Sequence, residues 1–207
     1  MGSLWEPKSN GFGFEHLEQE IKTDILIIGG GMAGILCAYM LQQAGIPYVL
    51  AEAQTIGNGI TKNTTAKITA HHGLIYNNLI RKFGVEKAKQ YLQANESALC
   101  KYREMCGGLD CDFEEKPSYV YSLDDRLKIE KEVLALEKLS CPAEFVQNLP
   151  LPFPVAGAVK CPNQAQFHPI KFISAISKEL HIYENTMVRE LVGTTAITDH
   201  GKIIAKK

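Results

Sequence analysis

The sequence has no surplus of either charge, no closely spaced cysteine pair and only one tryptophan. Its 22 lysines and arginines stand against 23 aspartates and glutamates, which gives a net charge of -1. Without a basic excess, the chain lacks the attraction that holds proteins to nucleic acid or anionic lipid, so we expect neither as a partner. Its six cysteines form no C-x-x-C pair and no Cys/His cluster at zinc spacing, which predicts reduced thiols, no metal site and a cytoplasmic location.

Apolar runs long enough to cross a membrane are also lacking. An uncharged run of 17 residues, 25–41, reaches the lower limit for a span, but the glycines at 29–31 divide it into a strand-length half and a helix-length half. The N-terminus lacks the basic-then-apolar order of a signal peptide. We therefore expect no membrane-spanning segment.

The overall composition is that of a globular protein. With 45% apolar and 22% charged residues the chain can bury a core, and its length suits one full domain or one and a half. The first 22 residues show no sustained period, and we expect them to form a lead-in arm on the surface. The pattern changes at Thr23.

A β-α-β unit of about thirty residues, the smallest parallel-sheet module, follows the arm. Residues 24–28 predict a strand buried on both faces of a parallel sheet, because Asp24 is followed by a continuous apolar run that ends in glycines. Residues 32–44 have a helical composition with Gly45 as a stop signal, and residues 47–52 form a second short apolar strand.

The turn between the first strand and the helix matches the G-x-G-x-x-G pattern of dinucleotide-binding proteins. Gly29 would allow the tight turn, Gly31 the approach of a pyrophosphate, and Gly34 the close packing of helix and strand. The helix N-terminus would then offer free N–H groups and a partial positive charge to the phosphates. Glu52 ends the second strand and would accept the hydroxyl protons of an adenosine ribose, which argues against NADP. The competing interpretation is a glycine-rich turn in an ordinary α/β protein with a surface glutamate.

Residues 54–69 favour FAD over NAD. This segment is rich in Gly, Thr and Asn, and Gly57, Gly59 and Thr61 provide a second set of small groups and hydroxyl donors. A longer ligand needs such a set, because FAD must be held at its pyrophosphate and at its distal flavin ring. An NAD-dependent enzyme on the same fold is the weaker alternative.

These features resemble the flavoprotein oxidoreductases of the D-amino-acid oxidase type, the group with glycine oxidase and sarcosine oxidase. The resemblance rests on the β-α-β unit, the Gly-x-Gly-x-Thr loop at 57–61, and Phe167-His-Pro169 followed by a helix and the stretch 183–188. It implies an α/β, Rossmann-like FAD-binding domain with an inserted α+β substrate region, and FAD as the cofactor. The FAD-binding residues that it implies are Gly29, Gly31, Met32, Ala33 and Gly34 at the pyrophosphate, Glu52 and Ala53 at the adenosine, Gly59 in the second glycine loop, Thr61 at a phosphate oxygen, Thr65 and Lys67 near the flavin ring, and the backbone of Val188 at the adenine.

The resemblance and the order of elements divide the chain into four segments. These are the arm 1–22, the first part of the FAD-binding domain at 23–107, the inserted substrate segment at 108–164, and the second part of the FAD-binding domain at 165–207. Within them we expect helices over 85–105, 124–139 and 169–180, strands at 118–122, around Phe145 and over 157–167, and a hairpin over 196–205.

Members of the group generally continue well past this length, so the resemblance implies that the C-terminal part of the fold is missing. An open sheet position would then remain, which a partner chain or self-association would cover. The function that the resemblance implies is FAD-dependent oxidation of a small-molecule amine or amino acid by hydride transfer to the flavin. The sequence identifies no catalytic acid or base. The alternative is a truncated, noncatalytic fragment that binds an adenine dinucleotide.

Other polar residues have simpler interpretations. Adjacent side chains at His71 and His72 point in different directions, which disfavours joint metal binding, although contact with a ligand is an alternative for them. His168, just before Pro169, is expected to cap the following helix. Tyr119 and Tyr121 alternate along a strand and share a face, where we expect packing rather than a substrate cavity.

Overall fold

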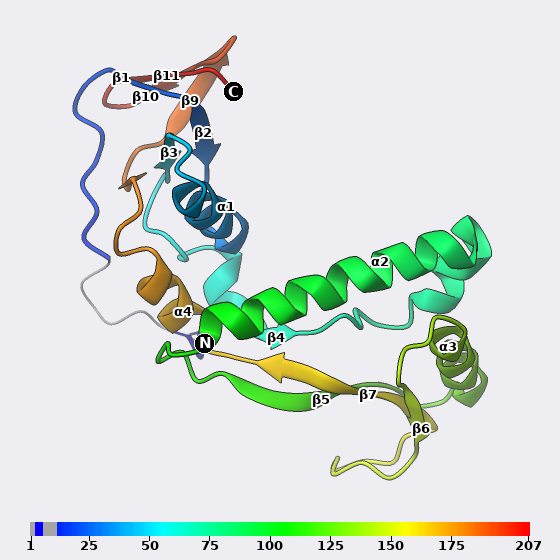
Figure 1. The fold of residues 1–207 in the computed structure, drawn as a ribbon. Helices are drawn as coiled ribbons and strands as arrows, with labels where there is room; N and C mark the ends of the chain where they lie inside the picture. The colour runs from blue at the N-terminus through cyan, green and yellow to red at the C-terminus, as the bar shows by residue number, and fades with distance from the viewer. Residues whose placement is uncertain (1–2, 6–11) are drawn as a thin grey trace. The chain divides into compact units, whose positions relative to one another are not determined.

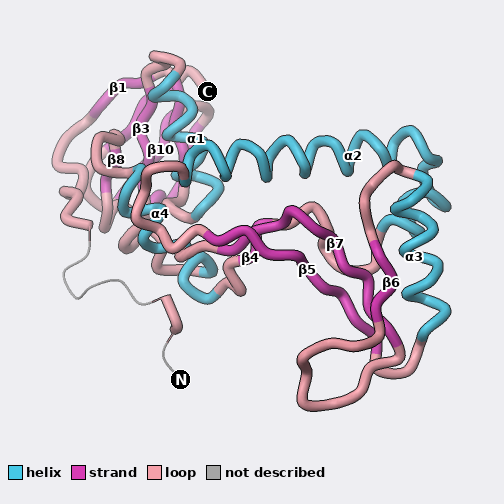
Figure 2. The backbone as a smooth tube through the Cα atoms, turned by 60° about the horizontal axis from the view of Figure 1, so that its bottom comes forward, coloured by secondary structure: helices cyan, strands magenta, loops and turns pink. Residues whose placement is uncertain are grey.

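The computed structural model describes residues 3–5 and 12–207. Their helices and strands form two compact units, drawn in Figures 1 and 2. The first unit takes its described residues from Met1–Thr65, Leu109–Cys111 and His168–Lys207, and the second from Ala66–Gly108 and Asp112–Phe167. Residues 1, 2 and 6–11 of the expected N-terminal arm lie outside the described residues.

Two sheets build the first unit. Its elements in chain order are β1 Ile21–Thr23, β2 Ile25–Ile28, α1 Met32–Gln43, β3 Tyr48–Ala51, the short 3-10 helix η1 Ile60–Asn63, α4 Pro169–Ile176, β8 Ile182–Tyr183, β9 Val188–Val192, β10 Thr195–Thr198 and β11 Lys202–Ala205. A three-stranded parallel sheet has the order β2-β3-β8, and a four-stranded sheet has the order β1-β11-β10-β9. Helix α1 packs against β2 and β3, as Figure 1 shows, which confirms the predicted β-α-β unit.

Strand β2 differs from its prediction in burial. It stands at the end of the order β2-β3-β8, so β3 is the one strand of the described residues that pairs with it in this sheet, and its Ile28 is 51% exposed. The expectation of a strand buried on both faces was wrong, and fits β3 instead, whose four residues are all buried. An apolar run shows that a segment can be buried, but not how many neighbours it has in the sheet.

The C-terminal hairpin was predicted correctly, but it belongs to a larger sheet. Strands β10 and β11 pair antiparallel, with Ala196 opposite Ile203. Strand β1, which falls partly in the expected irregular arm, pairs with β11 in parallel, with Ile21 opposite Ile203. A core of Leu17, Val49, Ala51, Ala196 and Ile203 lies between these strands and β3.

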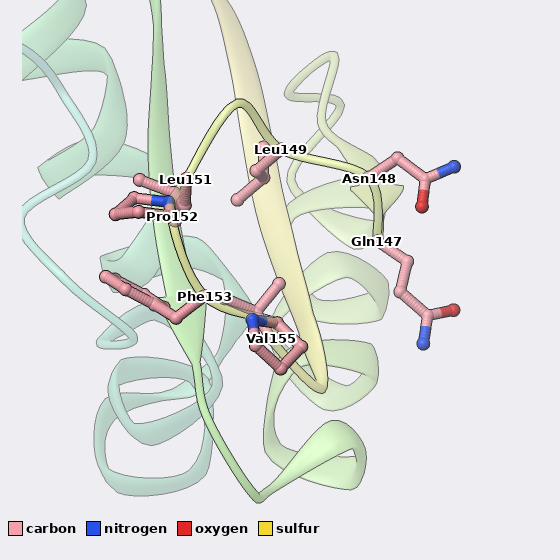
Figure 3. A pocket seen from close by; sticks show the side chains of 8 residues that line it. Gln147, Asn148, Leu149, Leu151, Pro152, Phe153 and Val155 are labelled. Atoms are coloured by element: carbon pink, nitrogen blue, oxygen red, sulfur yellow. The ribbon is translucent and has the colours of Figure 1, made fainter.

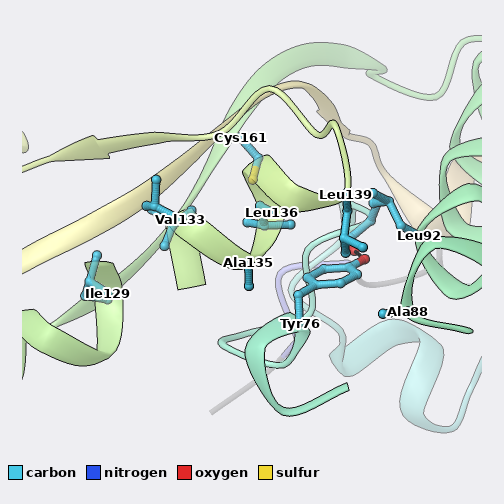
Figure 4. Close-up of a cluster of buried hydrophobic side chains, with 11 residues drawn as sticks. Tyr76, Ala88, Leu92, Ile129, Val133, Ala135, Leu136, Leu139 and Cys161 are labelled. Atoms are coloured by element: carbon cyan, nitrogen blue, oxygen red, sulfur yellow. Dashed lines mark hydrogen bonds between the residues drawn. The ribbon is translucent and has the colours of Figure 1, made fainter. Parts of the chain in front are cut away.

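The second unit is an antiparallel sheet with two helices. Its elements are β4 Lys67–Ile68, α2 Tyr76–Cys106, β5 Glu114–Ser122, α3 Arg126–Lys138, β6 Glu144–Val146 and β7 Gly157–Gln166. Strand β7 is the centre of the sheet, because β4, β5 and β6 all pair with it (Figure 2). Helix α3 packs on β5, β6 and β7, and α2 packs on α3, around the buried cluster of Figure 4.

Helix α2 begins nine residues before the predicted start at 85. It bends at Gly84, whose φ of 82° and ψ of 167° lie outside the helical region. The first two backbone amides of the helix, at Tyr76 and Asn77, donate to the carboxylate of Glu132 on α3, at 2.7 and 3.0 Å. This cap comes from a residue more than fifty positions downstream, so no local pattern could reveal it.

The two compact units divide the chain at places other than the predicted segment boundaries. Residues 66–108, which include α2, cluster with the second unit, whereas the predicted FAD-binding segment runs to 107. The reason is that α2 packs on α3 and shares its core. No helix among the described residues has both the length and the apolar character needed to cross a membrane.

Candidate cofactor-binding site

The turn from β2 into α1 has a backbone that only glycine fits at two positions. Gly29 has a φ of 104°, in the region that L-residues rarely adopt. At Gly34, an added Cβ would lie 2.0 Å from the carbonyl oxygen of Gly29, far inside any allowed contact. The turn therefore brings the first turn of the helix directly against the end of the strand.

Gly31 has a different role, because the space beside it is open. Its φ of -75° and ψ of -179° suit any residue, and the nearest atom to an added Cβ would be the Thr61 hydroxyl oxygen, at 3.7 Å. It is the N-cap of α1 and makes no side-chain cap. The backbone at this point is accessible to a ligand rather than covered by a side chain.

The helix that follows presents N–H groups to the same space. The first amides of an α-helix have no partner within the helix. The amide of Met32 donates to the Thr61 hydroxyl oxygen, at 3.1 Å. The amides of Gly31, Ala33 and Gly34 meet no acceptor among the described residues. These groups, together with the positive end of the helix dipole, form a site suited to an anion.

Glu52 faces the glycine turn. One of its carboxylate oxygens, Oε2, accepts the amide of Gly30 at 2.6 Å, and the other, Oε1, accepts the amide of Gln54 at 2.8 Å. These bonds fix the carboxylate beside the start of α1. Each oxygen retains a lone pair that can accept a further hydroxyl proton.

A segment far along the chain holds Glu52 and the loop after it. The amide of Thr186 donates to the Glu52 carbonyl at 2.8 Å, and the amide of Asn185 to the Gln54 carbonyl at 2.8 Å. Glu184, only 2% exposed, accepts the amide of Ile56 at 2.7 Å. Burial raises the pKa of Glu184, the Ile56 and Phe14 amides oppose this, and the charge of Glu52 raises it further.

Sequence reasoning assigned no role to Glu184 or to Gly30. A Cβ at Gly30 would lie 2.6 Å from Cγ2 of Ile56, so the middle glycine of the turn is required for packing. Gly30 occupies the first x of the G-x-G-x-x-G pattern, where any residue is allowed. Its contact with Ile56 in the structure is therefore what shows that a glycine is required there. Glu184 carried one available signal, since it is a charged residue directly after the short strand β8.

The second glycine loop lies against the first. The amide of Gly57 donates to the carbonyl of Gly30 at 2.9 Å, and Gly57 has a φ of 71° with Cδ1 of Ile170 3.0 Å from its Cβ position. Thr61, in η1, is 8% exposed and accepts from Met32. Because a hydroxyl can accept and donate at once, its proton is free for a ligand oxygen. The structure thus places Thr61 beside the glycine turn, and its bond to a phosphate oxygen stays a prediction.

The other predicted FAD-binding residues form no hydrogen bond with the glycine turn within the described part of the chain. Ala53 and Gly59 are exposed near Glu52 and η1, respectively, and Val188 opens strand β9 half-buried. Thr65 is the last residue of the first stretch of the first unit and is exposed. Lys67 is exposed on β4 in the second unit. The structure brings together the glycine turn, Glu52 and Thr61, and the other positions stay predictions.

Three other features singled out by the sequence or the structure lie outside this turn. His168 caps α4 by accepting the Lys171 amide on Nδ1 at 3.3 Å, which confirms its predicted role. Tyr119 and Tyr121 are 40% and 44% exposed on β5. A pocket of about 510 Å³ in the second unit, shown in Figure 3, is lined by the loop 147–155, in which no side chain titrates.

A glycine turn, an anion-binding helix terminus and a ribose-facing carboxylate define the dinucleotide-binding class of α/β proteins. The family model "FAD dependent oxidoreductase" matches residues 24–206 of this chain. The chain belongs to this family of FAD-dependent oxidoreductases.

Two curated proteins are similar in sequence. One, YhfW of Bacillus subtilis (strain 168), is provisionally named a Rieske 2Fe-2S iron-sulfur protein and is 34% identical over 91% of this chain and 39% of its own length. The other is the gamma-glutamylputrescine oxidoreductase of Escherichia coli (strain K12), 23% identical over 55% of this chain and 27% of its own length. The chain therefore spans about two fifths or less of these relatives.

Solved structures share the fold. L-proline dehydrogenase from P. horikoshii has a TM-score of 0.70 at 18% identity, over 92% of this chain and 52% of that one. Glycine oxidase from Geobacillus kaustophilus has a TM-score of 0.66 at 16% identity, over 89% of this chain and 54% of that one. L-amino acid deaminase from Proteus vulgaris has a TM-score of 0.69 at 17% identity, over 94% and 49%. The chain thus has the α/β fold of FAD-binding oxidoreductases and spans about half the length of these structures.

Proposed function

We propose that the first unit binds the ADP half of FAD at the turn between β2 and α1. The observation that carries the proposal is the juxtaposition of unpartnered helix amides, an open backbone at Gly31 and the Glu52 carboxylate. The amides of Gly31, Ala33 and Gly34 would hold the pyrophosphate, and the Thr61 hydroxyl would donate to a phosphate oxygen. Glu52 would accept the ribose hydroxyl protons.

The other predicted contacts belong to the same proposal. Met32 would line the pyrophosphate, Ala53 and the backbone of Val188 would border the adenosine, and Gly59 would leave room in the second loop. Thr65 and Lys67 stay candidates for the flavin end through the resemblance alone. The four-segment division into an FAD-binding domain with an inserted substrate segment at 108–164 is likewise proposed.

The residues of the first unit fit FAD. The donor set suits a diphosphate, because neutral amides and a helix terminus stabilise its charge without a cation. The Glu52 carboxylate would repel a ribose 2′-phosphate, as the discrimination against NADP requires. When bound, FAD supplies an isoalloxazine ring able to accept a hydride from a substrate C–H bond. The role of the first unit in this chemistry is to bind and orient the dinucleotide.

We propose that the substrate is a small amine or amino acid. Relatives in sequence or fold are named for proline, glycine, L-amino acids and gamma-glutamylputrescine, all of which carry a nitrogen beside an oxidisable C–H bond. We assign no catalytic acid or base. All six cysteines are free thiols, which suits the reducing cytoplasm that we propose as the location.

A second candidate function is dinucleotide binding without turnover. It is favoured by the share of the relatives that the chain spans, between 27% and 54% for those named above. In this case the chain would bind FAD or ADP with the same residues but would oxidise no amine.

One experiment separates these functions. The 207-residue chain is incubated with FAD, freed of unbound cofactor, and examined for absorbance at about 450 nm, where flavin absorbs and NAD does not. The flavin-loaded chain is then given a panel of amines and amino acids, and hydrogen peroxide is measured. Bound flavin with peroxide supports the oxidase, bound flavin without peroxide leaves the binding function, and no bound flavin rejects both.

A matched pair of variants links the binding to the site. Glu52→Gln removes the ribose-facing charge, and Glu20→Gln removes the same charge from an exposed residue of the same unit. Because a hydrogen bond to a charged group contributes about 1.5–3 kcal/mol, we expect Glu52→Gln to weaken FAD binding about 10- to 100-fold. Glu20→Gln should bind as the wild type does. Equal affinities of the two variants would rule Glu52 out as a ligand.

A further inference from the structure

The described N-terminal residues Ser3–Trp5 bond to the loop that carries Thr61, within the first unit. The Ser3 hydroxyl donates to the carbonyl of Lys62, and the indole Nε1 of Trp5 donates to the carbonyl of Thr64 at 2.8 Å. The amide of Trp5 in turn donates to the Ser3 hydroxyl oxygen at 3.0 Å, which joins the two residues. Both side chains thus reach residues that lie 59 positions further along the chain.

These two bonds fall at the end of the short helix η1. A 3-10 helix of four residues makes few hydrogen bonds of its own, and carbonyls at the end of a helix have no partner inside it. Within the loop, the Thr64 amide donates to the Thr61 carbonyl at 3.5 Å, which is a long hydrogen bond. Donors from outside the loop therefore help to fix its conformation.

Trp5 also contacts the start of α4. Its ring meets the ring of His168 edge-on, with centroids 4.9 Å apart and an interplanar angle of 67°. The backbone of His168 is held in turn, because its amide donates to the Cys111 carbonyl at 2.7 Å. Helix α4, which His168 caps, packs on η1. Trp5 thus joins the end of η1 to the helix that supports it.

The loop held in this way carries a residue of the proposed dinucleotide site. The Thr61 hydroxyl accepts the amide of Met32, the first residue of α1, at 3.1 Å, and Thr61 is 8% exposed. Lys62 is the next residue after Thr61, and Thr64 is the third. The bonds from Ser3–Trp5 to these two carbonyls therefore restrict the backbone that places the Thr61 hydroxyl.

We propose that Trp5 is a positioning residue of the dinucleotide site, which together with Ser3 fixes the end of η1 and so holds the Thr61 hydroxyl beside the first turn of α1. The proposal rests on the proposed function for its ligand, since Thr61 would donate to a phosphate oxygen. Trp5 acts through Thr61 and not by contact with the ligand. Its loss lowers the affinity by the fraction of chains in which Thr61 is no longer correctly placed.

Amide hydrogen exchange of the ligand-free 207-residue chain, followed by NMR, tests whether Trp5 fixes the loop. Trp5→Phe retains an aromatic ring but removes the indole N–H. We expect the amides of Thr64 and Met32, which both bond to Thr61, to exchange at least ~3-fold faster in this variant. The amide of Gly29, which bonds across β2 and β3, should keep its wild-type rate.

Leu4→Ala is the matched control for this experiment. Leu4 lies between Ser3 and Trp5 and is 90% exposed, so its truncation should leave all three exchange rates as in the wild type. Wild-type exchange at Thr64 and Met32 in Trp5→Phe would overturn the proposal. Exchange that rises by the same factor at Gly29 would also overturn it, because Trp5 would then stabilise the unit in general.

A double-mutant cycle tests the effect on binding. Calorimetric titration with ADP compares the wild type, Trp5→Phe, Thr61→Val and the variant with both changes. We expect Trp5→Phe to weaken ADP binding about 3- to 10-fold when Thr61 is present, and by less than ~2-fold when it is valine. An equal loss in both backgrounds would overturn the proposal, since Trp5 would then not act through Thr61. A wild-type chain that binds no ADP would reject the proposed function instead, and the exchange rates alone would then decide whether Trp5 holds Thr61.

Discussion

Alanine substitutions at Gly34 and Gly31 should separate the folding of the glycine turn from its binding of the dinucleotide. At Gly34 the added Cβ would lie 2.0 Å from the Gly29 carbonyl oxygen, well inside the ~3.3 Å of a close carbon–oxygen contact. Both atoms are attached to backbone, so the clash is relieved only when α1 moves away from β2. At Gly31 the nearest atom is 3.7 Å away and the backbone suits alanine.

The two expected costs differ clearly. Overpacking a core usually costs about 1–3 kcal/mol, and a backbone clash belongs at the upper end or above. We expect Gly34→Ala to lose at least ~3 kcal/mol, equivalent to a fall of roughly 6–12 °C in the unfolding temperature. Gly31→Ala replaces one N-cap residue with a poorer one and should lose at most ~1 kcal/mol. Its methyl group would occupy the space proposed for the pyrophosphate, so FAD affinity should fall at least ~10-fold, that is by about 1.4 kcal/mol or more.

Thermal unfolding followed by circular dichroism gives the first quantity, and titration with FAD gives the second. The reasoning is refuted when Gly34→Ala unfolds at the wild-type temperature, or when Gly31→Ala binds FAD as tightly as the wild type. A Gly31→Ala protein that loses as much stability as Gly34→Ala would also contradict it, since the structure leaves room for that methyl group.

Two further predictions concern buried ionisable groups. In the folded state the pKa of His71 is lowered from 6.5 to about 4. As the pH falls, the unfolded chain therefore binds a proton at this histidine before the folded chain does, which favours unfolding. The free energy of unfolding should fall by about 3 kcal/mol between pH 6.5 and pH 4. Urea unfolding at pH 7 and pH 4 should show this loss in the wild type but not in His71→Gln, and an equal loss in both would show that other groups, such as the neighbouring Glu132, cause it. Glu184→Ala should cost about 1–3 kcal/mol, because it leaves the buried amide of Ile56 without its acceptor, whereas Glu184→Gln retains an oxygen there and should cost less. Urea unfolding of the two Glu184 variants checks this order, and the reverse order would mean that Ile56 finds another acceptor.

The β-α-β unit could be predicted because its signals are local. An apolar run, glycines and a helical segment follow one another within 29 residues, from Asp24 to Glu52, and each constrains the backbone at its own position. The resemblance implied that Thr61 bonds a phosphate oxygen, whereas its hydrogen bond with the Met32 amide is seen only in the structure. Burial of β2 could not be predicted, because it depends on which strands pair with it.

Other parts of the structure depend on residues that are distant in sequence. The start of α2 depends on Glu132, which caps its first amides, and the residues from Tyr76 to Gly84 carry no strong local helix signal. Glu184 accepts the amide of Ile56 in the loop after Glu52, although the two residues are 128 positions apart in the sequence. The cluster of Cys161, His71 and Glu132 combines a strand, a connecting segment and a helix, so no sequence spacing indicates it.

The most direct test of the account compares two nucleotides. Calorimetric titration of the 207-residue chain gives its affinity for ADP and for ADP that carries a 2′-phosphate on its ribose. The ratio of the two affinities tests whether Glu52 contacts the sugar while the α1 amides hold the diphosphate. The account predicts that ADP binds, that the 2′-phosphate weakens binding at least ~10-fold, and that Glu52→Gln reduces this discrimination. Equal affinity for both nucleotides, or binding of neither, would contradict it.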